Sequence, residues 1–267
     1  MLWFVSNDLV PSRTIQLYGT YPAGLELQTL VWASDGHPLL ENVVFFEYTL
    51  IHKGADEITD MKIGMWEDAD LGEPFDDACG IDTQLRLAFS YNGIRSDNVY
   101  GLPPASGTVW LQTPVMAFPD SVARYGTERR EGYRNTRMTS FQHFIGGSSI
   151  YRDAEIGPSS SGALMMLNNL SGKGWDGRTF TDPSNGWPTP YLLSGDPVLD
   201  KDWVDGVTNS PGDRRYLSAA GGFTLAPGDT QKVTLARVAA EGYHRLLSVR
   251  DFFFTDTATH EIYTNLP

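Results

Sequence analysis

The stretch QLRLAFSY, residues 84–91, alternates apolar and polar side chains with a period of two. Successive side chains of a β-strand point to opposite faces of its sheet, so this alternation is typical of a strand with one buried face. The apolar positions would share that face: Leu85, Leu87, Phe89 and Tyr91. The pattern therefore predicts a half-buried strand over the whole stretch.

Further stretches along the chain show the same alternation. They are LELQTLVWA, VVFFEYTLIH, MKIGMW, TVWLQT and QKVTLARVA, which begin at residues 25, 43, 61, 108 and 231. Glycine, proline and asparagine mark turns between them, at 52–54, 92–93, 103–104 and 227–229. Short alternating strands joined by turns are typical of antiparallel sandwiches. We therefore expect an all-β fold, mostly an antiparallel β-sandwich.

One or two short helices and a long loop insertion should interrupt the strands. SSGALMMLNNLSG, residues 160–172, has helical spacing of its leucines and a glycine at its end. EGYHRLLSVRD, residues 241–251, favours the first turns of a second helix. Residues 172–222 are rich in glycine, proline, aspartate and tryptophan and show little periodicity. We predict one sandwich domain over residues 1–251, with a loop-rich insertion at about 114–222.

Composition argues against several classes of partner. The chain has 267 residues, with 33 acidic against 20 basic side chains and a formal charge of −13, which repels nucleic acid and anionic lipid. A single cysteine, Cys79, excludes an intrachain disulfide. No run reaches the roughly 18 apolar residues that cross a bilayer. The first residues lack the basic start of a secretory signal, so we expect any export signal upstream of this fragment.

The stretch WEDADLGEPFDDACGID, residues 66–82, concentrates carboxylates without any lysine or arginine. Two like charges about 4 Å apart repel by about 1 kcal/mol in water, and by several times more near a protein surface. Converging carboxylates therefore need a cation, and calcium accepts the irregular oxygen geometry of loops. The predicted calcium ligands are Asp68, Asp70, Asp76, Asp77 and Asp82. The alternative is a solvated acidic hairpin in which aspartate and glycine form turns.

A second, weaker candidate for an ion site is the group Asp200, Asp202 and Asp205 in DKDWVDG. Sequence signatures of a serine hydrolase and of a histidine metal site are absent. GPSSSG lacks the spacing of a nucleophile elbow, and the histidines show no metal-binding spacing. The sequence therefore identifies no catalytic residue, and an enzymatic role is left open.

The tryptophans suggest a different function, the binding of glycans. Aromatic rings can stack on sugars, so Trp175, Trp187 and Trp203, with Trp110, are candidate glycan ligands. Combined with the acidic loop, they would suit a carbohydrate-binding or glycoside-hydrolysing domain. The commoner alternative is that they cover a small satellite core.

An ordered series of motifs gives a family resemblance. WEDADLG, DDACGIDT, YGLPPA, SGDP, PGDRR and LAPGDTQKV follow one another along the chain. In this order they resemble a module of large bacterial exported proteins, often those with a C-terminal type IX sorting signal. The resemblance implies an extracellular or cell-surface sandwich, immunoglobulin-like or fibronectin-like, with no established catalytic residues.

These strands, carboxylates and motifs together predict a non-enzymatic, calcium-stabilised structural or adhesion module of a larger exported protein, with glycans or other surface proteins as partners. The alternative is the carbohydrate-active domain. The tail, residues 252–267, is different in kind: it resembles a translated sequencing adapter, and we predict that it is not native sequence.

Overall fold

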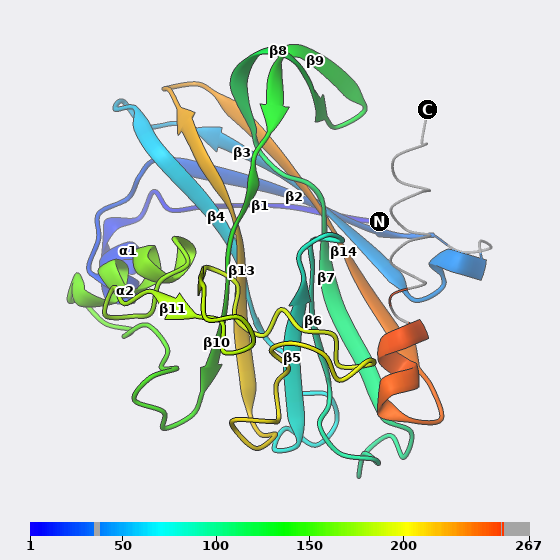
Figure 1. The fold of residues 1–267 in the computed structure, drawn as a ribbon. Helices are drawn as coiled ribbons and strands as arrows, with labels where there is room; N and C mark the ends of the chain where they lie inside the picture. Colours follow the sequence, from blue (N-terminus) through cyan, green and yellow to red (C-terminus); the bar gives the residue numbers. More distant parts are fainter. Residues whose placement is uncertain (35–37, 252, 254–267) are drawn as a thin grey trace.

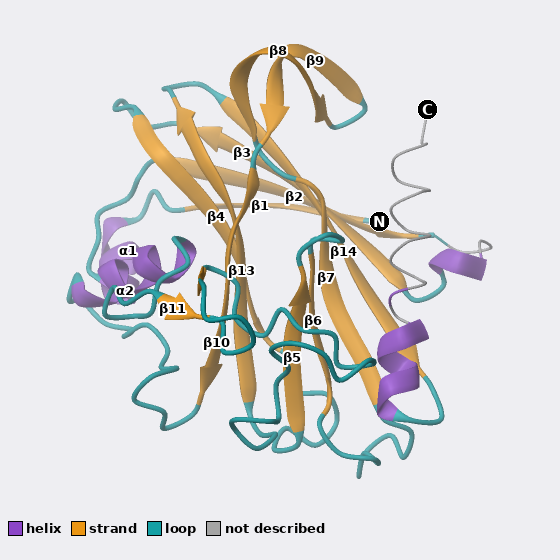
Figure 2. Ribbon diagram, viewed as in Figure 1, coloured by secondary structure: helices purple, strands orange, loops and turns teal. Residues whose placement is uncertain are grey.

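The computed structural model describes residues 1–34, 38–251 and 253. Apart from Phe253, the predicted non-native tail lies outside the described residues. The fold is all-β, as the alternation predicts: strands dominate, and the helices are few and short (Figures 1 and 2). No helix within the described ranges combines the length and apolar character needed to cross a membrane.

Two antiparallel sheets of unequal width form the sandwich. The wide sheet has seven strands in the order β1-β2-β3-β14-β7-β6-β5. Its strands are β1 Leu2–Asn7, β2 Leu25–Ala33, β3 Val43–His52, β14 Thr230–Glu241, β7 Pro104–Gln112, β6 Leu87–Asn92 and β5 Asp77–Asp82. The narrow sheet has three strands in the order β10-β13-β4. They are β10 Arg137–Ile145, β13 Arg214–Leu225 and β4 Ile58–Asp68.

The remaining strands and helices lie outside these two sheets. The twisted hairpin of β8 Val115–Tyr125 and β9 Glu128–Asn135 projects beyond the sandwich (Figure 1). A small ribbon pairs β11 Phe180–Thr181 with β12 Pro188–Thr189. The helices are α1 Pro11–Tyr18, the 3-10 turn η1 Pro38–Leu40, α2 Ser161–Leu170 and a helical segment at 245–251. Within the range 114–222, the loops are concentrated at 171–213.

Both helices expected from the sequence are present. α2 lies inside the stretch predicted to be helical and ends just before Gly172, whose φ of +75° suits the left-handed stop. The second helix begins at residue 245, after the last strand. α1 was not predicted from the sequence. It begins with a proline, and proline suits this position because the first N–H groups of a helix have no partner within it and proline has no N–H.

Every strand that the alternation predicts is present, with one correction at the start of β6. The prediction of a loop-rich insertion over 114–222 was wrong for much of that range, because it contains β8, β9, β10 and most of β13, whose sequences show no clear alternation. β2 and β3 begin and end where the pattern predicts. The prediction of a strand over residues 84–91 was wrong at its start, because residues 83–86 form a turn in which Arg86 has a φ of +57°. It was also wrong about exposure. Every residue of β6 is buried, because β6 lies inside the wide sheet with cores on both sides.

Those two cores divide the apolar side chains of β6. Leu87 and Phe89 belong to the cluster on the outer face of the wide sheet, which Val249 of the C-terminal helical segment helps to cover. Ala88 belongs to the cluster between the two sheets, together with Trp110 of β7. A strand at this position needs apolar residues at successive positions rather than at alternate ones.

The narrow sheet leaves part of the wide sheet uncovered. The core between the sheets contains buried residues of β5, β6, β7 and β14. β3 contributes the half-buried Phe46 and Tyr48, and its buried Leu50 clusters with Phe223 and Leu225 of β13. β1, at the far edge, is exposed along its whole length. β4 therefore ends the narrow sheet while the wide sheet continues past it (Figure 1).

Candidate metal centre

The acidic stretch is not one loop. β4 ends at Asp68, residues 69–76 turn back, and β5 begins at Asp77, so Asp77 and Asp82 lie on a strand. The turn passes through Gly72, whose φ is +75°. A Cβ atom at Gly72 would overlap the carboxylate of Asp97, so the turn packs closely against the loop that follows β6.

Four polar side chains converge where β5 begins and β6 ends. Asp77 lies opposite Asn92 in the β5–β6 pair. Asn92 Nδ2 donates to Asp76 Oδ1 at 3.1 Å and to Asp97 Oδ2 at 3.2 Å. The exposed fractions are 7% for Asp76, 0% for Asp77 and Asn92, and 3% for Asp97. We call Asp76, Asp77, Asn92 and Asp97 the buried acidic cluster.

Three oxygens of this cluster lack a partner. Asp76 Oδ2, Asp77 Oδ1 and Asn92 Oδ1 are buried and accept no hydrogen bond from any described residue. Leaving a buried polar atom unsatisfied costs about 1–3 kcal/mol, and more for a charged group. No ion pair of the described residues includes Asp76, Asp77 or Asp97. Their negative charge is therefore not offset by a basic side chain.

The electrostatics differ among the three carboxyls. Burial raises the pKa of Asp77 to about 8, and the charges of Asp76, Asp70 and Asp97 add to the rise, against a hydrogen bond from the Leu71 N–H. Burial, followed by the charge of Asp97, also raises the pKa of Asp76.

The pKa of Asp97 shifts in the opposite direction. Burial acts to raise its pKa, but hydrogen bonds outweigh it and lower the pKa overall. The donors are the backbone N–H groups of Tyr100, Glu73 and Val99 and the side chain of Asn92. One carboxyl is thus held ionised beside two whose ionised forms are disfavoured, which is the arrangement that a bound hard cation would relieve.

Two other predicted ligands lie on the surface. Asp68 and Asp70 each bring one carboxylate oxygen within 4.8 Å of the other and of Asp213. This surface group already contains a cation from the protein, because Arg215 Nη1 contacts Asp213 Oδ2 at 2.8 Å. Arg215 also pairs with Asp153 at 3.0 Å.

Asp82 lies apart from both groups. Its Oδ1 accepts the backbone N–H groups of Gln84 at 2.8 Å and Leu85 at 2.9 Å, so it caps the turn that precedes β6. The structure therefore separates the predicted ligands into a buried pair, an exposed pair and a turn cap. It adds Asn92 and Asp97, which the sequence reading missed because only the pairing of β5 with β6 brings them close.

The second acidic candidate, residues 200–205, does not gather around an ion. Asp205 is buried and its carboxylate binds Arg214, with Nε 2.8 Å from Oδ2. The same oxygen accepts the backbone N–H of Cys79 at 3.0 Å. Asp200 and Asp202 are exposed. The arginine therefore takes the place that a metal would have.

The candidate sugar-binding tryptophans do not form a shared platform. Trp110 and Trp203 are buried in the core between the sheets, and Trp110 Nε1 donates to Ser218 Oγ at 2.9 Å. Trp175 is half-buried and donates to the Ser149 carbonyl at 3.1 Å. Trp187 alone of these four is largely exposed, at 73%.

No protein-family model matches the chain, and a search of curated proteins gives no match.

Proposed function

We propose that this chain is a non-enzymatic structural module of a larger exported protein, stabilised by a calcium ion in the buried acidic cluster. The observation that supports it is the set of three buried oxygens without partners, on Asp76, Asp77 and Asn92. A cation among them would satisfy the oxygens and offset the carboxylate charge in one step. The predicted ligands Asp76 and Asp77 are kept, and Asn92 and Asp97 are added.

Calcium suits this cluster better than magnesium. The oxygens come from the last residue of a turn, the first residue of β5, an amide and a loop carboxylate, and calcium accepts such irregular sets of six to eight ligands. Magnesium requires a near-ideal octahedron and usually keeps several waters, which a fully buried Asp77 would not accommodate.

An ion at this place would act on the fold rather than on a substrate. The cluster joins the turn at 69–76, the start of β5, the end of β6 and the loop that contains Asp97. Binding would therefore hold these four parts of the chain together at one end of the sandwich. Calcium sites of extracellular modules have dissociation constants of about 10⁻⁴–10⁻³ M, so a role in surface display or adhesion outside the cell agrees with this site.

Thermal unfolding in EDTA and in millimolar calcium tests the proposal. For a dissociation constant of about 10⁻⁴ M, calcium at about 10 mM is 100 times that constant and adds about 2.7 kcal/mol if it binds only the folded state, which raises Tm by about 5–10 °C for a chain of this size. Asp77→Asn should lose the response. Asp68→Asn, in the surface group, and Asp82→Asn, at the turn cap, should keep it. Overlapping curves for the unsubstituted protein would overturn the proposal, and loss of the response in Asp68→Asn alone would move the ion to the surface group.

A further inference from the structure

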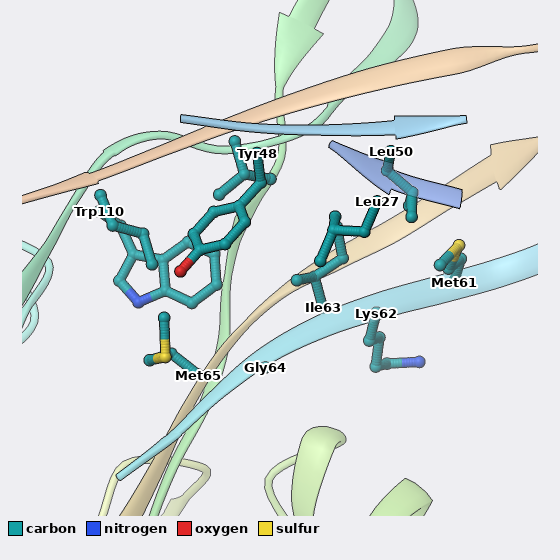
Figure 3. A pocket seen from close by; sticks show the side chains of 11 residues that line it. Leu27, Tyr48, Leu50, Met61, Lys62, Ile63, Gly64, Met65 and Trp110 are labelled. Atoms are coloured by element: carbon teal, nitrogen blue, oxygen red, sulfur yellow. The ribbon is translucent and has the colours of Figure 1, made fainter. Parts of the chain in front are cut away.

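An apolar cleft of about 320 Å³ lies between β4 and the inner face of the wide sheet (Figure 3). Met61, Ile63 and Met65 line it from β4. Leu27 of β2 and Tyr48 and Leu50 of β3 line it from the opposite side. The cleft is thus located where the wide sheet continues past the last strand of the narrow one.

The cleft follows the edge of β4 rather than one of its faces. Five consecutive residues, 61–65, border it. Alternate side chains of a strand point to opposite faces, so a cleft on one face would meet only every second residue. Gly64 indeed faces away, because a Cβ atom on it would point at Leu170 of α2. What all five residues share is their backbone along the strand edge.

That edge is free. β4 pairs with β13 on one side, and no described strand pairs with it on the other. A free edge presents a row of backbone N–H and C=O groups that can pair with another strand. Proteins often protect such edges, and the start of β4 shows this: Asp60 has a φ of +50° and Lys62 borders the cleft. From Ile63 to Asp68 the strand has no positive φ and no proline, so the unprotected part of the edge lies there.

The opposite wall of the cleft fits the side chains of an added strand. Leu27 and Leu50 are register partners in the β2–β3 pair, so they lie side by side on the inner face of the wide sheet. Tyr48 continues this row toward Trp110 (Figure 3). A strand paired with β4 would place alternate side chains against these residues, as the strands of the narrow sheet do elsewhere in the sandwich.

The negative charges at the two ends of β4 indicate that a partner with positively charged ends would bind there. Asp56 and Glu57 are exposed just before the strand, and Asp68 and Asp70 are exposed at its end. The segment between them has apolar residues facing the cleft. An incoming strand with apolar residues in its middle and lysine or arginine at its ends would match both features.

We propose that the free edge of β4 binds an extended peptide segment of a partner protein as an added strand, with alternate apolar side chains in the cleft and basic residues at its ends. Backbone pairing with β4 supplies affinity, and the apolar wall selects the alternating side chains. A small apolar ligand would fill the cleft but leave the polar backbone edge without a partner. This binding is independent of the calcium proposal.

Hydrogen exchange of the full chain with a synthetic peptide tests this. The probe is acetyl-Lys-Val-Thr-Val-Thr-Val-Lys-amide, which alternates and carries basic ends. It should bind and slow amide exchange within residues 58–68, because the edge N–H groups gain acceptors. The matched control peptide carries N-methyl groups on every residue, which removes all its backbone donors, and it should bind at least tenfold more weakly. Absence of binding, or protection at another strand, would overturn the proposal.

Two variants locate the contact. Met61→Arg places a charge in the cleft and should weaken binding of the first peptide at least tenfold. Leu164→Arg, on the exposed side of α2 where Leu164 is 61% exposed, should leave binding unchanged. Equal binding of both peptides would indicate uptake of apolar groups without strand pairing and would also overturn the proposal. If Met61→Arg does not fold, the exchange pattern of the unsubstituted chain decides.

Discussion

Asn92 lies opposite Asp77 in the β5–β6 pair, yet its side-chain amide donates to Asp76 and Asp97 and not to Asp77. The consequence is that Asn92 Oδ1 and Asp77 Oδ1 both remain buried without a donor from any described residue. The hydrogen bonds that organise the cluster thus also leave oxygens available to a cation.

Asn92→Ala should therefore have two separable effects. It removes the donor to Asp76 Oδ1, so the metal-free protein should lose about 1–3 kcal/mol of unfolding free energy. It also removes one proposed ligand oxygen, so the calcium-dependent increase in stability should shrink. Urea unfolding in EDTA and in calcium measures both. An unchanged calcium increment would exclude Asn92 as a ligand.

Gly72→Ala should disturb the cluster from outside it. Gly72 has a φ of +75°, which is strained for alanine, and the added Cβ would overlap the Asp97 carboxylate. We expect a loss of at least 1 kcal/mol together with weaker calcium binding, measured by calorimetric titration. Gly132→Ala is the matched control: its φ is +77°, but no atom lies within 4 Å of its added Cβ, so calcium binding should be unchanged.

The buried pair of Asp205 and Arg214 should tolerate joint replacement better than single replacement. Both side chains are 1% exposed, and removing one partner leaves an uncompensated buried charge. Asp205→Ala should therefore cost about 3–5 kcal/mol in urea unfolding. Asp205→Leu combined with Arg214→Met should recover part of that loss. A double variant no more stable than Asp205→Ala would show that the hydrogen bonds to Cys79 and Ser210 matter more than the charges.

His143 should make the protein sensitive to acid. It is buried against Tyr151 with both ring nitrogens unpartnered among the described residues. Burial lowers its pKa to about 4; the charge of Asp205 opposes the shift and that of Arg214 adds to it. Because the unfolded chain takes up the proton at about pH 6.5, this contribution is complete above that pH and is lost as pH falls toward 4.

The slope is at most about 1.4 kcal/mol per pH unit. Urea unfolding at pH 7 and pH 5 should show it, and His143→Phe should have a shallower dependence. A slope unchanged in His143→Phe would assign the acid sensitivity to other groups.

The sequence by itself located β2, β3, β4, β6, β7 and β14, and hence the all-β class, but it missed β10 and β13 of the narrow sheet. The alternation that defines β2 and β3 is local: it depends only on opposite orientation of successive side chains. The sequence also identified the acidic stretch that contains Asp76 and Asp77, but it did not distinguish them from Asp68, Asp70 and Asp82. The helix at 160–172 was equally local, since its leucine spacing and terminal Gly172 lie within one stretch.

Only the tertiary structure decided which side chains meet. Asp97 joins Asp76 because β6 turns back against β5, and Asp82 leaves the group because it lies at the other end of β5, where it caps a turn. Burial was also decided at this level. β6 is covered on both faces because of its place inside the wide sheet, and β4 keeps a free edge because the narrow sheet ends with it. Neighbours across a sheet are set by strand order, and the alternation of one strand does not encode strand order.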